Sequence, residues 1–278
     1  MTTATAATTP GGATSPRRRP ARFGTYRALP PGHVPYVLAI DDHPVNLKLV
    51  AAQLAALGAT VRTASSGEEG LRLWRSGEYD AVITDCNMGD MDGYTLCAAI
   101  RAFEQVGGHP HLPVVGWTVS AIAETRDACH AAGMDAVLVK PVSLEALRAA
   151  LATWFPVLAA SGADAFPASS TDAMMPLDPG ALTMLDDADA IVSEFLAQAH
   201  ADARELAAAL QGGDAVRAAR VLHRLRGASL MVGAERLAAS CAGMPCETDS
   251  PHDAVDAVEV IERELARIEE YTLRQASP

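Results

Sequence analysis

From Tyr36 onward, short apolar runs alternate with longer runs of helical spacing, and this alternation constrains the possible fold more than any other feature. The apolar runs are typical of buried strands and lie at 36–40, 59–64, 79–85, 112–118 and 135–140. The helical runs lie at 44–58, 67–77, 95–107, 121–132 and 143–155. Five strands alternating with five helices predict an α/β doubly wound parallel sheet. In such a sheet, sites lie at the carboxyl ends of the strands.

The second half of the chain has a different pattern, which is helical throughout. Helices are expected at roughly 187–211, 214–231, 234–247 and 252–273. Glycine and proline separate them, for example Gly212-Gly213 and Gly233. This region, 177–274, is therefore predicted to be a separate all-α helical bundle.

Two segments lack either pattern. Residues 1–35 contain no acidic residue and carry five arginines, so we expect a disordered basic arm. Residues 157–176 are small, polar and proline-bearing, which favours a linker. The first folded unit is then 36–156.

Composition excludes several classes of protein. The net charge of −12 argues against nucleic acid as the main partner. The five cysteines are scattered, with no CxxC pair, which favours a reducing, cytoplasmic location. No apolar run approaches the roughly 18 residues of a membrane span, so no transmembrane segment is expected.

Polar residues follow the apolar strands and should meet at one edge of the sheet. They are Asp41, Asp42, Asp85, Thr118 and Lys140. Three neighbouring acids repel one another unless a cation compensates, and Mg²⁺ prefers such oxygen ligands. Lys140 adds a positive charge, and Thr118 offers a hydroxyl to a phosphoryl oxygen. The pattern predicts Asp85 as a nucleophile that forms an acyl phosphate.

The motifs AIDDHPVN, ITDCNMGDMDGY, GWT and VKP fall in order at these strand ends, and residues 36–156 thereby resemble a flavodoxin-like response-regulator receiver domain. The resemblance implies that Asp85 is the phosphoacceptor. It also implies that Mg²⁺ is bound by Asp41, Asp42, Asp85 and the backbone carbonyl of Asn87.

By the same resemblance, Thr118 is the switch hydroxyl and Lys140 contacts the phosphate. Three residues depart from the family pattern. Gly89 stands where proline is usual, and Val119 is larger than usual and is expected to narrow access to the site. Val137 replaces the usual switch aromatic, which favours a relay over an output switch.

The run HRLRGAS contains the most informative residue of the second half, His223. On a helix, His223 points about 160° away from an apolar stripe formed by Val221, Leu222, Leu225, Ala228 and Val232. We therefore expect its imidazole in solvent, with Gly227 clearing the approach and Arg226 and Arg220 supplying positive charge. Such an imidazole suits a phosphate acceptor; the alternative is an ordinary surface histidine.

Residues 223–244 resemble a histidine phosphotransfer (HPt) domain, in which Arg226 replaces the commoner lysine. A receiver followed by an HPt domain is similar to the C-terminal part of unorthodox hybrid sensor histidine kinases. Val216, Ala219 and Leu230 project within about 40° of His223, and we expect them to form a docking patch for a receiver. The alternative is ordinary surface or intra-bundle contact.

Other candidates favour structural roles. His43 is expected to be an exposed loop residue. His109 and His111 lie in a Gly-Pro loop, where two histidines without further ligands make no metal site. Cys241 and Cys246 are expected to be packing residues.

These features predict an intermediate in a His–Asp–His–Asp phosphorelay. An upstream histidine kinase would phosphorylate Asp85, and His223 would pass the group to a downstream response-regulator receiver. No ATP-binding or kinase segment is visible, so the chain is expected to be a phosphotransfer protein without its own kinase core. The alternatives are a phosphate-sink or titration module, and a detached part of a hybrid kinase. Whether transfer is intramolecular or intermolecular stays open.

Overall fold

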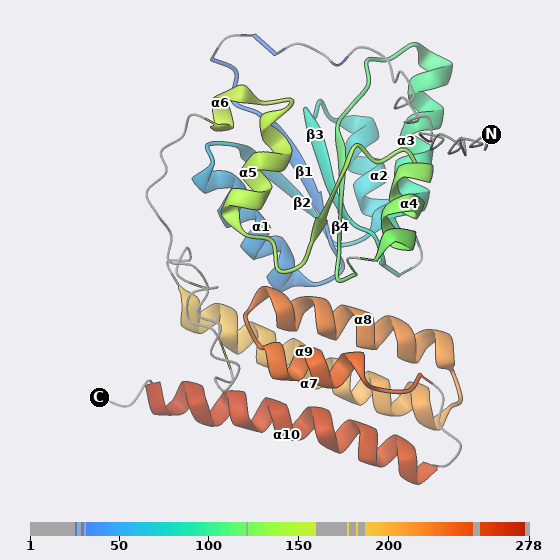
Figure 1. Ribbon diagram of the computed structural model, residues 1–278, viewed down its shortest axis with the longest axis vertical. Coiled ribbons are helices and arrows are strands. Elements are labelled where there is room, and N and C mark those ends of the chain that lie inside the picture. The colour runs from blue at the N-terminus through green and yellow to red at the C-terminus, as the bar shows by residue number, and fades with distance from the viewer. Residues whose placement is uncertain are drawn as a thin grey trace, which may run out of the picture.

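The computed structural model has an α/β domain stacked on a helical bundle (Figure 1). It describes residues 26, 29–30, 32–89, 91–120, 122–159, 177, 182, 187–246 and 251–275. Within that part of the chain, no helix is long and apolar enough to cross a membrane.

The first domain is built on a parallel sheet of five strands in the order β2-β1-β3-β4-β5. Their bounds are β1 Tyr36–Ile40, β2 Thr60–Ala64, β3 Ala81–Asp85, β4 Val114–Thr118 and β5 Ala136–Val139. The central strands β1, β3 and β4 are buried on both faces, as their continuous apolar character predicts. The predicted doubly wound parallel sheet is confirmed.

Helices cover both faces of the sheet (Figure 1). On one face lie α1 Pro44–Ala56 and α5 Leu144–Ala152; on the other lie α2 Gly67–Ser76, α3 Gly93–Gly107 and α4 Ala123–Ala131. A short helix, α6 Pro156–Ala159, follows α5. Side chains at the predicted boundaries cap several helices: Ser66, Asp92 and Ser143 each accept a hydrogen bond from a backbone N–H of the first turn.

The second domain is the predicted helical bundle. It comprises α7 Ala188–Gln211, α8 Ala215–Met231, α9 Glu235–Ala242 and α10 Pro251–Gln275. Helix α7 packs against both α8 and α10. Its core is aliphatic, with Phe195 as its largest fully buried side chain.

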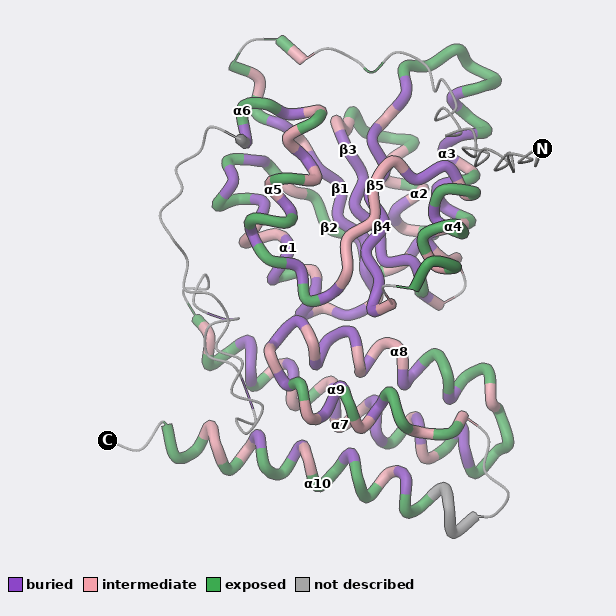
Figure 2. The backbone as a smooth tube through the Cα atoms, in the orientation of Figure 1, coloured by how far each residue is buried: buried purple, intermediate pink, exposed green. Residues whose placement is uncertain are grey.

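The bundle contacts the sheet domain through α7 and α8, which pack against α1. A single cluster of buried apolar side chains extends from α1 and α5 into the bundle. Lys48 of α1 and Glu194 of α7 form an ion pair across the boundary. Helix α8 lies beneath the carboxyl ends of the strands, and buried residues line its contact with them (Figure 2).

The predicted basic arm and linker lie largely outside the described residues, and their described parts are structured. Tyr26 forms a parallel β-bridge with His111 and donates a hydrogen bond to Asp135. His33 contacts Asp80 at 2.7 Å. Residues 157–159 belong to α6, so helical structure extends past the expected start of the linker.

Candidate functional site

The carboxyl edge of the sheet brings together the acids that the sequence singles out. Asp41 follows β1, Asp42 is its neighbour, and Asp85 ends β3. Because β1 and β3 are adjacent and parallel, their ends meet. One carboxylate oxygen from each acid lies within 4.8 Å of the others, and this is the only such cluster of potential metal ligands among the described residues. The expectation that the three acids lie together is therefore met.

Lys140, which follows β5, provides the cation at this edge. Its Nζ donates hydrogen bonds of 2.8 Å to Asp41 Oδ2 and Asp85 Oδ2. It also lies 4.8 Å from the centre of the Trp117 ring. Burial alone would lower the pKa of Lys140, but the charges of Asp41 and Asp85 outweigh it and raise the pKa. Lys140 is therefore a fixed positive charge.

Lys140 neutralises only part of the negative charge of the three carboxylates. Burial raises the pKa of Asp41, although Lys140 opposes the shift. Burial, together with the charges of Asp41 and Asp85, raises the pKa of Asp42 to about 7. Asp42 Oδ1 is buried and has no hydrogen-bond partner within the described part of the chain. An unpaired buried oxygen beside two further carboxylates fits a hard divalent cation such as Mg²⁺.

Thr118 and Asn87 flank the acids. Thr118 ends β4, is fully buried, and accepts a hydrogen bond from the Ser120 N–H at 3.2 Å. Asn87 is exposed, and its N–H donates to Asp85 Oδ1 at 3.3 Å. The structure thus brings every receiver residue named from the sequence to one edge.

The prediction that His43 is an exposed loop residue is wrong. It is fully buried and caps α1, because its Nδ1 accepts a hydrogen bond from the Val45 N–H at 3.3 Å. Its own N–H donates to Asp41 Oδ1 at 2.8 Å. Burial lowers the pKa of His43 to about 4, so the ring is neutral at pH 7 and holds the Asp41 loop in place.

Asn46 is a residue that the sequence reasoning missed. It lies in the first turn of α1, buried, and its Nδ2 donates to Asp41 Oδ1 at 2.9 Å. The sequence does contain a signal for this role, because Asn46 is a polar residue in an apolar helix, one turn after the acid pair. Together with His43 it fixes the Asp41 carboxylate.

His223 also differs from expectation, because its imidazole is not held in solvent. The residue is half-buried, and its Nε2 is buried with no hydrogen-bond partner among the residues described. Burial lowers the pKa of His223 to about 4, and the nearby charge of Lys140 adds to the effect. What covers it is the sheet domain: Lys140 and Asp41 act on it across the boundary. The sequence pattern correctly predicted which face of α8 carries His223. It did not predict that the sheet domain covers this face.

Gly227 of α8 lies close to the carboxyl edge of the sheet. A Cβ built on this residue would lie 3.5 Å from Lys140 Nζ and 3.5 Å from Val119 Cγ1. The glycine predicted to clear an approach therefore faces the receiver itself, and Val119 forms part of the contact.

The receiver of this chain leaves most of the predicted docking patch uncovered, and docking of a separate receiver there stays a prediction. Val216 is 71% exposed and Ala219 is exposed, while Leu230 is half-buried. The sheet domain contacts α8 around His223 and Gly227, which lie between Ala219 and Leu230. The helical projection placed residues by angle and took no account of position along the axis.

Arg224 is a second residue missed from sequence. Its guanidinium donates to Asp202 at 2.7 Å and to Glu205 at 2.8 Å, and Asp202 is fully buried. Its charge also acts on Asp42 across the boundary and lowers that pKa slightly against the larger raising effects. Arg226 is partly exposed, and its charge contributes to the lowered pKa of His223.

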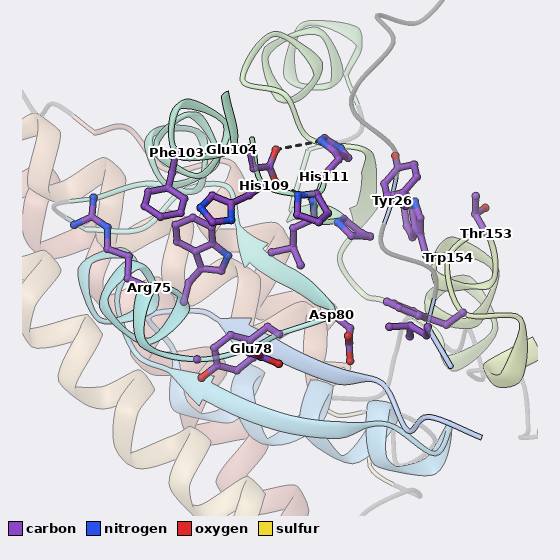
Figure 3. Close-up of a pocket in the computed structure, with 18 residues that line it drawn as sticks. Tyr26, Arg75, Glu78, Asp80, Phe103, Glu104, His109, His111, Thr153 and Trp154 are labelled. Atoms are coloured by element: carbon purple, nitrogen blue, oxygen red, sulfur yellow. Dashed lines mark hydrogen bonds and ion pairs between the residues drawn. The ribbon is translucent and has the colours of Figure 1, made fainter. Parts of the chain in front are cut away.

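The opposite, amino edge of the sheet holds a second group of charged residues. His111 is buried between Glu104, at 3.2 Å, and Asp135, at 2.7 Å. Arg101 donates to both of these acids. The group borders a cavity of about 590 Å³ (Figure 3), where Phe103 and His109 stack with ring centres 4.8 Å apart. His109 and His111 thus take part in packing and ion pairing.

The two bundle cysteines are packing residues, as predicted. Cys241 is 4% exposed and belongs to the apolar core, and Cys246 is partly buried against it.

Comparisons with known families agree with this geometry. Residues 37–152 match the family described as the response regulator receiver domain, and residues 190–271 match the Hpt domain. The order of the two families is the one that the sequence resemblance predicted.

Among curated relatives, the virulence sensor protein BvgS of Bordetella pertussis is 38% identical over 217 residues, covering 72% of this chain and 17% of that protein. The sensor histidine kinase RcsC of Salmonella typhi is 44% identical over 118 residues, covering 42% of this chain and 12% of that protein. The chain thus spans less than a fifth of each of these relatives.

Among solved structures, the receiver domain of the Pseudomonas aeruginosa sensor histidine kinase PA1611 is 31% identical, with a TM-score of 0.41. The match covers 45% of this chain and 99% of that domain, which carries a magnesium ion in its active-site cleft.

Proposed function

We propose that this chain, which belongs to the response regulator receiver family over residues 37–152 and to the Hpt family over residues 190–271, has a phosphorelay role in two-component signalling, with Asp85 and His223 as its two phosphate carriers. We further propose that the group passes between them within one chain. The observation that carries this proposal is the position of His223, with its unpartnered Nε2, against the acid edge of the same molecule.

The first step is phosphorylation of Asp85. A carboxylate oxygen attacks the phosphorus of the donor, and the bond from phosphorus to the donor's leaving group breaks. Lys140 stabilises the charge that develops on the phosphoryl oxygens, and Thr118 offers a hydroxyl. Asp41, Asp42, Asp85 and the Asn87 carbonyl would hold Mg²⁺, which supplies further charge neutralisation when bound.

The second step moves the group to His223. With a pKa of about 4, the docked imidazole is neutral at pH 7, so Nε2 has a free lone pair for attack. The new N–P bond forms while the acyl O–P bond breaks, which returns Asp85 to a carboxylate. The cations Lys140 and Arg226 lie close enough to lower the pKa of His223, and the same charges stabilise the phosphoryl oxygens during transfer.

The partners follow from these two steps. We assign an upstream histidine kinase as the donor to Asp85 and the receiver of a separate response regulator as the acceptor from His223, in a cytoplasmic setting. A phosphate sink is not favoured, because the chain combines a receiver with an Hpt domain and its relatives are named as a sensor histidine kinase and a virulence sensor protein.

The experiment uses a small acyl phosphate, acetyl phosphate, as the donor to the full chain. Acyl phosphates are cleaved by base, whereas phosphohistidine survives base and is cleaved by acid, so the two carriers can be distinguished. We expect wild type to accumulate base-stable label, His223→Gln to hold only base-labile label, and Asp85→Asn to hold none.

Intramolecular transfer is tested by dilution and by mixing. The rate constant for base-stable label should not change when the protein is diluted, and a mixture of Asp85→Asn with His223→Gln should form that label at least roughly tenfold more slowly than wild type. Circular dichroism of each variant checks folding. A mixture as fast as wild type would show transfer between chains, and base-stable label in His223→Gln would remove His223 as a carrier.

A further inference from the structure

Two thiols meet directly behind the acid edge. Cys86 follows Asp85 at the end of β3, and Cys129 lies in the last turn of α4. Their sulfur atoms are 3.6 Å apart, and both residues are fully buried and free. Neither takes part in the proposed phosphate transfer, so their contact requires a separate explanation.

The sheet makes room for this pair. A Cβ built on Gly116, in the middle of β4, would lie 3.1 Å from the Cys86 sulfur and 2.5 Å from the Met134 sulfur. Any larger residue at this position would displace the sulfur atoms. The backbone around Cys86 is equally fixed, because its N–H donates to the Trp117 carbonyl and its carbonyl accepts from the Gly93 N–H.

Helix α4 is held to the sheet by one of these thiols. Cys129 is the only buried residue of α4, whose other residues are exposed or half-buried. A helix with so little buried surface opens locally at low cost, and opening would expose Cys129 to small molecules. The hydrogen bond from Cys86 lowers the pKa of Cys129, which favours the reactive thiolate at that position.

We propose that Cys86 and Cys129 form an oxidation site, at which a peroxide converts the two thiols to an intramolecular disulfide. The Cys129 sulfur attacks a peroxide oxygen, the O–O bond breaks, and water leaves behind a sulfenic acid. The Cys86 sulfur then attacks the Cys129 sulfur, the S–S bond forms, the S–O bond breaks, and a second water leaves. Two thiols are oxidised and one peroxide is reduced to two waters.

The product ties α4 to the residue that follows Asp85. In the reduced chain, packing and the hydrogen bond between the two thiols attach α4 there; in the oxidised chain it is attached covalently. This inference does not depend on the proposed phosphate transfer, because the modification and its effect on α4 are measured without any phosphodonor.

The test treats the full chain with hydrogen peroxide, alkylates the remaining thiols, and maps the peptides. Trypsin separates the two cysteines into peptides 76–101 and 127–148, since Lys140 precedes a proline. We expect a linked pair of these peptides that dithiothreitol releases, with fragmentation assigning the link to Cys86 rather than Cys97. Its yield should exceed that of any other cysteine pair by about tenfold, because no other pair of cysteines is in contact in the described part of the chain.

Hydrogen exchange supplies the second measurement. Amides of α4 should exchange more slowly in the oxidised chain, whereas those of α8 should not change. Cys129→Ala should abolish both the link and the slower exchange, and Cys86→Ala does the same should the first variant unfold. Cys241→Ser, a buried thiol of the bundle, is the matched control and should leave both unchanged.

Two results would overturn the proposal. One is alkylation of both Cys86 and Cys129 after peroxide treatment. The other is a linked pair that leaves exchange in α4 unchanged.

Discussion

The two edges of the sheet each bury a group of charged residues, yet the groups differ in how completely they are paired. At the amino edge, Arg101 and His111 are both bound to Glu104 and Asp135. Burial tends to raise the pKa of each acid, but these partners outweigh it and lower both. At the carboxyl edge, the acids outnumber the cation, and the pKa of Asp42 rises to about 7.

This difference in pairing distinguishes a group of residues that stabilises the fold from a group that can bind a ligand or react. A fully paired buried network rigidifies the fold, whereas buried polar atoms without partners mark a place that takes a ligand or a reacting group. Of the atoms without partners, Asp42 Oδ1 lies at the carboxyl edge, and His223 Nε2 lies on α8, where the charges of Lys140 and Asp41 act on the ring.

The largest expected effect tests reactivity at the two edges. Asp85→Asn should remove acetyl phosphate labelling by roughly 10⁴-fold or more, because a carboxamide is not a nucleophile. Asp135→Asn, the matched change at the amino edge, should leave the labelling rate of the folded protein within about twofold. Residual labelling of Asp85→Asn near the wild-type rate would mean that another residue accepts the group.

The next effect concerns stability. Arg101→Met should lower the free energy of unfolding by about 3–5 kcal/mol, because it leaves Glu104 and Asp135 buried without the guanidinium that pairs with both. Lys140→Met should also destabilise, but Mg²⁺ should restore much of that loss, since three carboxylates lie together there. Urea denaturation with and without Mg²⁺ measures both. Equal rescue of the two variants by Mg²⁺ would contradict the comparison.

The two histidines should respond oppositely to pH. Burial lowers the pKa of His111, but its hydrogen bonds to Asp135 and Glu104 outweigh this and raise it above 6.5. Its contribution to stability is therefore fully present below pH 6.5 and is lost as pH rises through the folded pKa. The pKa of His223 is lowered to about 4, so stability is lost as pH falls from 6.5 towards 4, where the unfolded ring binds a proton first.

The difference in unfolding free energy between wild type and His111→Gln, and between wild type and His223→Gln, isolates each ring as pH is varied. The two differences should have slopes of opposite sign. Slopes of the same sign would show that one of the two environments is wrongly described.

The smallest effect tests the exposed contact between domains. Lys48→Ala should weaken docking of the bundle by about 0.2–1 kcal/mol, because the pair with Glu194 is solvent-exposed. A double-mutant cycle with Glu194→Ala measures the coupling free energy of this pair. Docking is followed by small-angle scattering or by a fluorescence pair placed on the two domains. A coupling above about 2 kcal/mol would place this pair among buried ones.

Much of this architecture follows from the sequence alone. The strands follow from short apolar runs, and the acid edge follows from what comes directly after them, because parallel strands end together. The helical period also placed His223 on the correct face of α8. What failed were features set by contacts between distant segments. His43 reads as a loop residue because its cap on α1 and its hydrogen bond to Asp41 depend on backbone geometry.

The packing of the sheet domain over His223 could not be predicted, because the sequence pattern of neither domain determines how the two domains contact each other. The same reason explains why Val216 is exposed although it is apolar: the sheet domain contacts α8 nearer to Gly227. Arg224 was missed because its partner Asp202 lies on another helix.

The packing of α8 against the acid edge affects how the phosphoryl group can be transferred to another protein. A domain tethered to its own target meets it at an effective concentration on the order of millimolar, whereas a separate regulator in a cell competes from a far more dilute pool. Signal can leave only if the internal complex is loose enough to exchange. Gly227, which adds no side chain where α8 faces Lys140 and Val119, and the exposed ion pair of Lys48 with Glu194 favour such exchange, against the buried apolar cluster that joins the two domains. Tightening this contact by design would therefore trap the phosphate rather than speed its delivery.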